Sequence, residues 1–162
     1  MKHQKDQYIW GFLRIVMGLM FIWPFFDKLI GLGFSTPGSK SWLNGTSPTL
    51  GFLKSASGPF AGLYQGMAGH PVVDFLFMMG LLLIGLALIF GIGIKVASWS
   101  GVLLMVLMWS SHLPPQQNPI IDDHIVYLFV FLGFYYSNAG HYLGLGKWWS
   151  QTALVKKFRF LE

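Results

Sequence analysis

The stretch of sequence that decides the fold is residues 118–145, NPIIDDHIVYLFVFLGFYYSNAGHYLGL. It places three ionisable residues, Asp122, Asp123 and His124, directly before a long apolar run. Residues 125–145 contain no Asp, Glu, Lys or Arg, and about 20 such residues are what a helix needs to cross a bilayer. Charge at the mouth of a membrane helix is costly unless it has a role. The pattern therefore predicts a membrane-spanning helix that begins with a polar group where water meets lipid.

The composition of the whole chain agrees with this prediction. Its 162 residues are 54% hydrophobic, 17% aromatic and only 10% charged, and the mean hydropathy is +0.55. These values are typical of membrane proteins. The apolar segments predict four spans, at about 8–32, 73–94, 96–113 and 123–145. We therefore expect one all-α domain over residues 1–162, an integral membrane four-helix bundle.

The first connection, residues 33–71, is rich in Gly, Ser, Thr and Pro but also contains many large apolar residues, among them Trp42, Phe52 and Phe60. A disordered loop rarely contains so many. We expect short helices lying in the membrane interface. The N-terminal apolar run follows Lys2 and Lys5, but it is too long for a secretory signal and no A-x-A-like site follows, so it is interpreted as the first helix.

The distribution of basic residues predicts the orientation. In the four-span arrangement one side has Lys28, Lys40 and Lys54, and the other side has Lys2, Lys5, Lys95, Lys147, Lys156, Lys157 and Arg159. The positive-inside rule then places both termini in the cytoplasm and the chain in the cell membrane as a multi-pass protein. The net charge of +5 is explained by this topology and by attraction to anionic membrane lipid. No basic stripe or motif indicates nucleic-acid binding.

The chain contains no cysteine. This excludes disulfides, iron–sulfur clusters held by thiolates and a CxxC-type quinone-linked oxidase. Any redox chemistry must use another group.

Most of the proton-active side chains fall on the side of the bundle opposite the termini. They are Asp27, Lys28, His70, Asp74, His112, Asp122, Asp123 and His124. A carboxylate at the start of a helix often does no more than cap it, and capping is the preferred interpretation of Asp74. Capping explains one acid of the Asp122, Asp123 and His124 triplet but not all three residues. A structural role and a catalytic role both stay open for the triplet.

Aromatic residues lie next to the polar residues, deeper in the expected spans. Tyr127 shares a helical face with His124, and Trp109 precedes His112 on the third span. Aromatic stripes usually reflect packing. At the outer end, however, imidazoles and carboxylates above an aromatic wall are what a quinone ring requires, because its reduction needs proton donors beside a flat apolar slot.

Arg14 lies about two turns into the first span, and it shares a helical face with Lys28. One interpretation is structural, with Arg14 anchoring the helix and extending towards the interface. The other pairs it with a group of the fourth helix or with an anionic head group. Pro24 is expected to kink the helix and to turn Asp27 and Lys28 towards the bundle.

Haem is a further alternative, since His112 and His124 could supply one ligand each from two helices. Nothing in their spacing requires it. We expect no haem and no metal ion.

Several blocks resemble the DoxX/DoxD family: RIVMGLMFIWPFFDKL (14–29), WLNGTSPTLGFL (42–53), GPFAGLY (58–64), AGHYLGL (139–145) with Trp148-Trp149, and above all NPIIDDHIVY (118–127). The resemblance extends over nearly the whole chain. It implies a four-helix membrane protein similar to the small integral subunit of thiosulfate:quinone oxidoreductase, an enzyme that oxidises thiosulfate to tetrathionate and passes the electrons to quinone.

Two classes of function follow. In the first, the chain is a subunit of a quinone-linked oxidoreductase: Asp122, Asp123 and His124 handle protons, while Arg14, Asp27, Lys28, Trp109, His112 and Tyr127 contact substrate or quinone. In the second, it is a non-catalytic membrane scaffold or anchor that docks a soluble redox enzyme. Both classes predict a partner subunit or a homo-oligomer. A solute carrier is less well supported, because no acid pair or broken-helix pattern lies at mid-span.

Overall fold

The computed structural model describes residues 2–115 and 118–162, and within these ranges all regular structure is helical. The body consists of four long helices: α1 (Lys2–Ile30), α4 (Pro71–Phe90), α5 (Ile94–Ser110) and α6 (Asp123–Ser137). Shorter elements follow α1 and α6: η1 (Gly38–Lys40), η2 (Trp42–Asn44), α2 (Leu50–Lys54), α3 (Ala61–Gly66), η3 (Ala139–His141), α7 (Gly146–Ser150), α8 (Ala153–Lys157) and η4 (Arg159–Leu161). The short helices expected between the first two spans are therefore confirmed.

Two helices are long and apolar enough to cross a membrane by length and composition. They are Asp6–Ile30 within α1, and α4. Helix α5 is apolar but has 17 residues, and α6 has 15. At 1.5 Å per residue these two are roughly 25 and 22 Å long, against about 30 Å for the hydrocarbon core of a bilayer.

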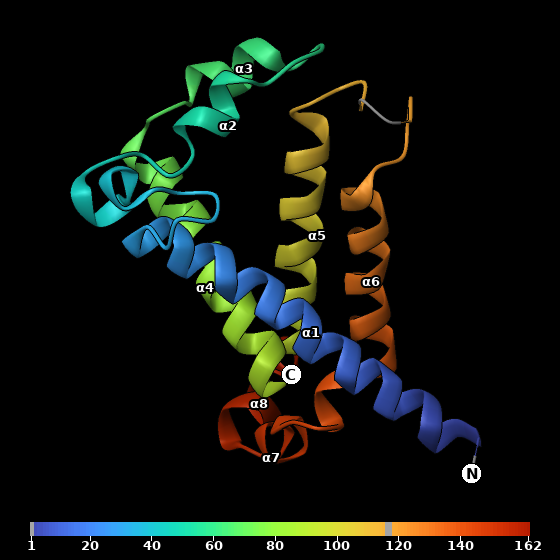
Figure 1. Cartoon of the computed structure of the whole chain (residues 1–162). Coiled ribbons are helices and arrows are strands. Elements are labelled where there is room, and N and C mark those ends of the chain that lie inside the picture. The colour runs from blue at the N-terminus through green and yellow to red at the C-terminus, as the bar shows by residue number, and fades with distance from the viewer. Residues whose placement is uncertain (1, 116–117) are drawn as a thin grey trace.

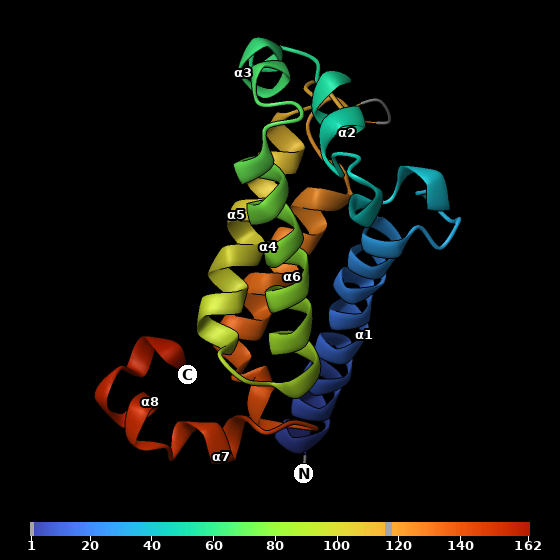
Figure 2. The ribbon, with the colours of Figure 1, turned by 90° about the vertical axis from the view of Figure 1, so that its left-hand side faces the viewer.

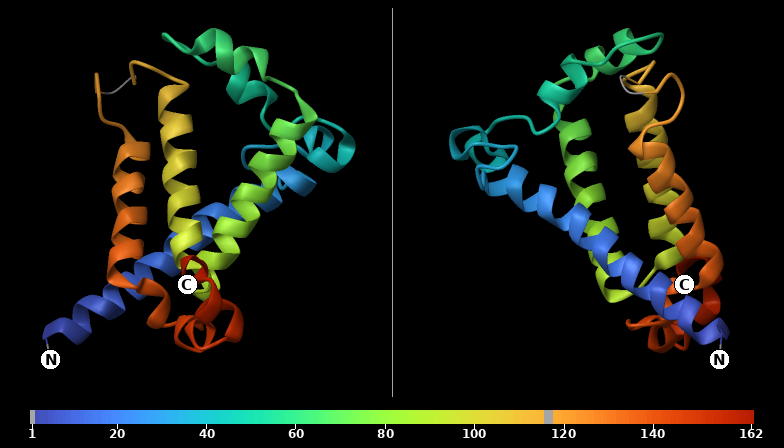
Figure 3. Two further views of the ribbon diagram at one scale, coloured as in Figure 1. Left: turned by 180° about the vertical axis from the view of Figure 1, so that it is seen from behind. Right: turned by 45° about the vertical axis from the view of Figure 1, so that its right-hand side comes forward.

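The long helices form two close pairs, α1 with α4 and α5 with α6. Helix α1 runs obliquely across the other three (Figures 1 and 3). Helices α5 and α6 lie side by side, whereas α4 diverges from them towards the end that carries α2 and α3 (Figures 1 and 3). The first described residues and the segment after α6 gather at one end of the molecule, whereas α2 and α3 lie at the other (Figure 1).

The core lies where α6 meets the other long helices. Phe131, Phe134 and Met78 are completely buried in it. Phe21 of α1 packs edge-on against Phe131, with ring centroids 5.5 Å apart. Gly101 of α5 lies so close to the Phe131 ring that a β-carbon would overlap it. Full burial of one such side chain stabilises the fold by about 1.5–3 kcal/mol.

The boundaries of the first three long helices lie near the expected spans. Helix α1 continues through Pro24 to Ile30. Helix α4 has Pro71 at its first position, where a missing N–H costs nothing. It ends before Gly91, which has a left-handed backbone with φ of 74°. Such a residue is the usual C-terminal cap of a helix.

The fourth helix was expected to reach residue 145, and this prediction is wrong. Helix α6 ends at Ser137, and Asn138 follows in a left-handed conformation with φ of 50°. Asparagine tolerates this conformation better than most residues. The apolar residues after Asn138 form a compact turn, η3 and the chain beyond it. This turn does not continue the helix. Its carbonyl groups accept hydrogen bonds from a side chain of α1.

That side chain is Arg14, which is completely buried. Its Nε donates to the carbonyl of Ala139 at 3.2 Å, and Nη2 donates to those of Tyr142 and Leu143 at 3.1 and 3.0 Å. Nη1 donates to the carbonyls of Leu88 and Ile89 in the last turn of α4. The last turn of a helix carries unpaired carbonyls and partial negative charge, so the guanidinium is well placed between the end of α4 and the turn that follows α6. Arg14 therefore has the structural role, not an interfacial one.

Candidate functional site

The candidate site begins at the first turn of α6, where Asp122 is the N-cap residue. Its Oδ1 accepts hydrogen bonds from the backbone N–H groups of His124 and Ile125, at 3.0 and 3.3 Å. A carboxylate fits here because the first N–H groups of a helix lack partners. The other oxygen, Oδ2, lies 2.8 Å from Nδ1 of His124. Asp122 thus caps the helix and orients an imidazole at the same time.

The environment of Asp122 lowers the pKa of its carboxyl below the usual value of 3.8. Burial acts in the opposite direction and raises the pKa, but it is outweighed. The hydrogen bond from His124, the positive charge of that imidazole when protonated, and the two backbone N–H groups all lower it. Asp122 is therefore ionised at neutral pH. A carboxylate on Nδ1 fixes the tautomer of His124, so that Nε2 is the nitrogen that can exchange a proton with a ligand.

Trp109 and Asn118 shape the connection that leads into α6. The side-chain oxygen of Asn118 accepts from the N–H groups of Ile120 and Ile121, at 2.9 and 3.0 Å. The indole Nε1 of Trp109 donates to the carbonyl of Ile120 at 2.9 Å. Trp109 was expected to contact quinone. In the structure it attaches this connection to the end of α5.

His112, just beyond α5, is the second imidazole of the site. Its Nδ1 lies 2.8 Å from Oγ of Ser111, and its Nε2 lies 3.2 Å from Oγ of Ser55. Ser111 also donates to the carbonyl of Met108 at 2.7 Å, so its oxygen accepts from His112 Nδ1. The ring of Phe52 packs against the imidazole with centroids 4.7 Å apart. His112 is therefore held from α5 and from the α2 segment together.

The segment that carries α2 and α3 is attached to the end of α5 by further contacts. The backbone N–H of Ser57 donates to the carbonyl of Ser111 at 2.9 Å. The hydroxyl of Tyr64 lies 2.7 Å from that of Ser110. Gly58 has φ of 81° and lies directly against the carbonyl of Leu113, where a β-carbon would clash. These contacts place Ser57 opposite the first turn of α6.

Between these groups lies an open cleft of about 280 Å³. It is lined by Ser57, His112, Pro114, Pro115, Asp122, Asp123 and His124. Its volume is close to the lower end of the range for small-molecule pockets, about 300–1,000 Å³. The structure thus brings together in one cavity four of the residues that the sequence suggested, His112, Asp122, Asp123 and His124.

The cleft combines groups that accept and release protons. Two carboxylates and two imidazoles line it together with the hydroxyl-bearing Ser57. Asp123 is exposed, whereas Asp122 and His124 are half-buried. An imidazole oriented by a carboxylate is a common general acid or base. Two carboxylates in one cleft also repel anions, so the cavity favours neutral or cationic ligands.

Among the residues that the structure describes, no group of three or more His, Cys, Asp or Glu side chains is arranged to hold a metal ion. His112 and His124 do line the same cleft, but each has another partner. Nδ1 of His112 bonds Ser111, and Nδ1 of His124 bonds Asp122.

Asp27 and Lys28 are not among the residues that line the cleft. Asp27 is buried at the end of α1, where it accepts from Oγ of Ser35 at 2.6 Å and from the N–H groups of Phe34 and Ser35 at 3.2 and 3.1 Å. It closes the turn that follows the helix. Lys28 is half-buried in the same last turn. The expectation that these two residues contact substrate is therefore not supported by their positions.

Arg14 and Tyr127 also lie outside the cleft. All five N–H donors of Arg14 have backbone carbonyl partners, so none is left for an anionic substrate. Tyr127 is half-buried and packs against the main hydrophobic core. Asp74 was expected to cap α4, but His70 is the N-cap. Asp74 accepts instead from the hydroxyls of Ser47 and Thr49, at 2.7 and 2.5 Å.

Sequence reasoning missed Ser57, Pro114 and Pro115 as parts of the site. The two prolines directly follow the expected third span, and their side chains have no polar group that would mark them. Ser57 comes from a segment more than fifty positions before His112 and reaches it through one backbone pairing. No local pattern in the sequence marks that pairing.

Comparison with protein-family models, with curated proteins and with solved structures gave no match for this chain.

Proposed function

We propose that this chain is an integral membrane four-helix protein in which α1, α4, α5 and α6 all span the bilayer, with both termini in the cytoplasm. The support comes from the outward faces of these helices. Ile9, Phe12, Leu83 and Phe129 are each more than 60% exposed. Large apolar side chains in such number are rarely exposed to water. The irregular chain after α6 extends the short fourth span towards the membrane surface.

We further propose that the protein is a subunit of a quinone-linked oxidoreductase, as its resemblance to the DoxD subunit suggests. The reaction expected for such an enzyme joins two thiosulfate ions to one tetrathionate and releases two electrons. A quinone takes up these two electrons and two protons to become a quinol. The observation that carries the proposal is the cleft in which His112, Asp122, Asp123 and His124 meet.

The residues of the cleft fit a quinone head group. The volume of about 280 Å³ suits a single substituted ring. Pro114 and Pro115 supply apolar wall, and Nε2 of His124, when the imidazole is protonated, is a potential donor to a carbonyl oxygen. In this proposal His124, oriented by Asp122, transfers a proton to the ligand, while exposed Asp123 returns a proton from water.

The same geometry argues that the sulfur donor is oxidised elsewhere. Thiosulfate carries two negative charges, and two carboxylates line the cleft. Arg14, which was a candidate for binding an anion, has its donors committed to carbonyls. We therefore propose that a partner subunit binds the donor and delivers the electrons.

The second candidate is a membrane scaffold that docks a soluble redox enzyme. The segment between α1 and α4 favours it, because Phe34, Leu43 and Leu63 are 74%, 70% and 64% exposed there. In this alternative, Asp122 only caps α6 and the cleft has no ligand.

A cleft-blocking variant separates the two candidates. The full chain is purified in mild detergent, and binding of a short-chain ubiquinone is followed by quenching of tryptophan fluorescence. Ser57→Phe fills the cleft, and Ser39→Phe adds the same ring at an exposed serine outside it. We expect saturable binding to the wild type and to Ser39→Phe, and at least tenfold weaker binding to Ser57→Phe. Equal binding to all three proteins, or binding to none, would favour the scaffold.

A further inference from the structure

The segment after α6 carries a basic, aromatic surface at the end of the molecule opposite the cleft. Lys147, Lys156, Lys157 and Arg159 are all exposed. Trp148 and Phe160 are 61% and 64% exposed among them. We call these six residues the basic tail surface. Figure 2 shows α7 and α8 leaving the end of the bundle sideways, so this segment does not continue the direction of the helices.

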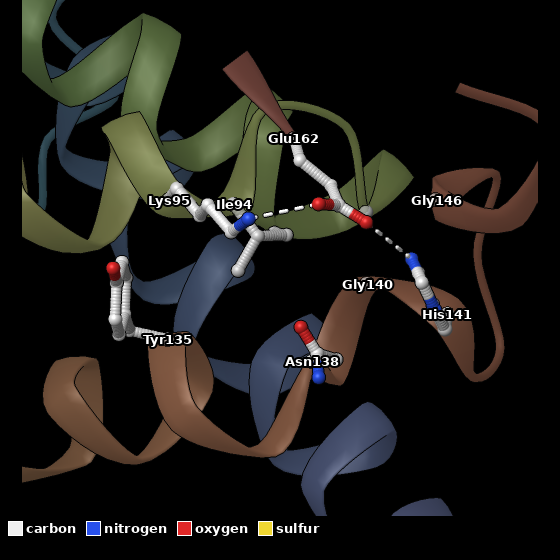
Figure 4. Close-up of a pocket in the computed structure, with 9 residues that line it drawn as sticks. Ile94, Lys95, Tyr135, Asn138, Gly140, His141, Gly146 and Glu162 are labelled. Carbon is white, nitrogen blue, oxygen red and sulfur yellow. Dashed lines mark hydrogen bonds and ion pairs between the residues drawn. The ribbon is translucent and has the colours of Figure 1, made fainter. Parts of the chain in front are cut away.

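Glu162, at the end of this segment, is already paired. Oε2 of Glu162 lies 2.8 Å from Nζ of Lys95, and Oε1 lies 3.4 Å from Nε2 of His141 (Figure 4). The hydrogen bond from Lys95 is the main reason that the pKa of Glu162 lies below its usual range. Glu162 therefore stays ionised and neutralises Lys95. Among the described residues, no ion pair joins the cations of the basic tail surface to a carboxylate.

Several contacts hold the segment in place. The backbone N–H of Lys95 donates to the carbonyl of Glu162 at 2.8 Å. The indole Nε1 of Trp149 donates to the carbonyl of Leu161 at 2.6 Å. Val155 is 2% exposed. Lys95 and Glu162 line a cavity of only about 10 Å³, close to the volume of a single water site (Figure 4). The tail is thus packed against the bundle, and its cations are presented on a defined surface.

We propose that the basic tail surface binds the head groups of anionic phospholipids. The inference rests on the membrane location proposed above but not on the quinone chemistry. Cations attract anionic lipid, and exposed tryptophan and phenylalanine favour the boundary between head groups and acyl chains. A bilayer surface supplies both the negative charge that the cations attract and an apolar layer for the rings of Trp148 and Phe160. The combination of charge and exposed rings therefore favours a bilayer surface.

The test compares two lipids and two matched double variants. The purified full chain is titrated with phosphatidylglycerol or phosphatidylcholine, and bound lipid is counted by native mass spectrometry. Lys156→Gln/Lys157→Gln removes two cations of the basic tail surface. Lys40→Gln/Lys54→Gln removes two exposed cations at the other end. Each lysine near an anionic surface contributes a factor of about five to binding.

We expect the wild type to bind phosphatidylglycerol at least tenfold more tightly than phosphatidylcholine. Lys156→Gln/Lys157→Gln should weaken binding of phosphatidylglycerol by at least tenfold, and the control variant should not. Lys156→Arg/Lys157→Arg should keep the preference, which shows that charge is responsible. Equal affinity for the two lipids, or the same loss in the Lys40 and Lys54 variant, would overturn the proposal. Quinone binding in the cleft serves as the independent check, because it should be unchanged in all these variants.

Discussion

Nε of Arg14 in α1 donates a hydrogen bond to the carbonyl oxygen of Ala139, 3.2 Å away and 125 positions later in the chain. The same guanidinium bonds the last turn of α4 through Leu88 and Ile89. One buried cation therefore joins three segments at the end of the molecule where α4 and α6 terminate. No carboxylate takes part, so the stabilisation comes from carbonyl dipoles.

Replacing Arg14 is expected to loosen this junction. Arg14→Met keeps much of the volume but leaves buried carbonyls without donors, which should cost about 3 kcal/mol. For a chain of this length that corresponds to a melting temperature lower by roughly 6–12 °C. Thermal unfolding in detergent measures the change. Arg14→Lys should fall between the two proteins, and Lys54→Met, at an exposed loop position, should match the wild type. A melting temperature for Arg14→Met within about 2 °C of the wild type would contradict this role.

The second prediction concerns the ion pair at the start of α6. Because the pKa of Asp122 is lowered in the folded protein, its contribution to stability is present above about pH 4 and is lost as the pH falls through the folded value. Asp122→Asn still caps the helix but lacks the charge. We expect the wild type to exceed Asp122→Asn by about 1 kcal/mol at pH 6, and the difference to shrink towards pH 2. In a His124→Gln background the pH-dependent difference should be smaller. A difference that is constant over this range would argue against the pair.

A third prediction separates Asp27 from the cleft. Asp27→Ala leaves the N–H groups of Phe34 and Ser35 without their acceptor and should destabilise the protein by about 2 kcal/mol. Ser35→Ala removes a single bond from the hydroxyl and should cost less. Quinone affinity per folded molecule should be unchanged in both variants, since Asp27 does not line the cleft. If Asp27→Ala lowers quinone affinity while the melting temperature stays constant, Asp27 belongs to the binding site after all.

The long helices could be predicted from the sequence because their limits are marked locally. Pro71 and Gly91 bound α4, and an apolar run fills the interval between them. The end of α6 could not be predicted in this way. Residues 139–145 contain no Asp, Glu, Lys or Arg, so composition alone extended the span through them, whereas in the structure their carbonyls bond Arg14. Hydropathy does not detect a contact that joins residue 14 to residues 139–143.

The candidate site, too, could be predicted from the sequence only in part. Asp122, Asp123 and His124 are adjacent in the sequence, so their proximity was evident, and a capping role for one of the two acids followed from their position before an apolar run. Their meeting with Ser57 depends on a long-range backbone pairing with Ser111. Asp27, at the end of α1, shows the opposite case, in which a polar residue expected in the site lies outside it. Asp27 seemed available for chemistry, but its oxygens are used to close a local turn.

The fourth prediction tests the proposed topology. The chain has no cysteine, so a single introduced one can be labelled without background. Ser39 is exposed beside the buried Ser41, and Gln151 is exposed after α7. In intact cells a membrane-impermeant maleimide should label Ser39→Cys but should label Gln151→Cys only after lysis. The reverse pattern would invert the orientation, and labelling of both positions in intact cells would contradict the three spans, α4, α5 and α6, that separate them.

The last prediction asks whether the cleft is functional or structural. Asp123 is exposed, and His124 is bonded at its side chain only to Asp122 in the described structure, so neither side chain has a large part in the fold. Asp123→Asn and His124→Ala should therefore cost about 1 kcal/mol or less. Loss of a proton-transfer group lowers a rate by a factor on the order of 100 or more. With the partner subunit and thiosulfate present, quinone reduction should fall by that factor in His124→Ala, while expression and melting temperature stay close to the wild type. Asp6→Asn, an exposed acid near the N-terminal end of α1, is the control and should keep full activity. Variants that fail to fold, with unchanged turnover in the folded fraction, would show that the triplet is structural and that the protein is a scaffold.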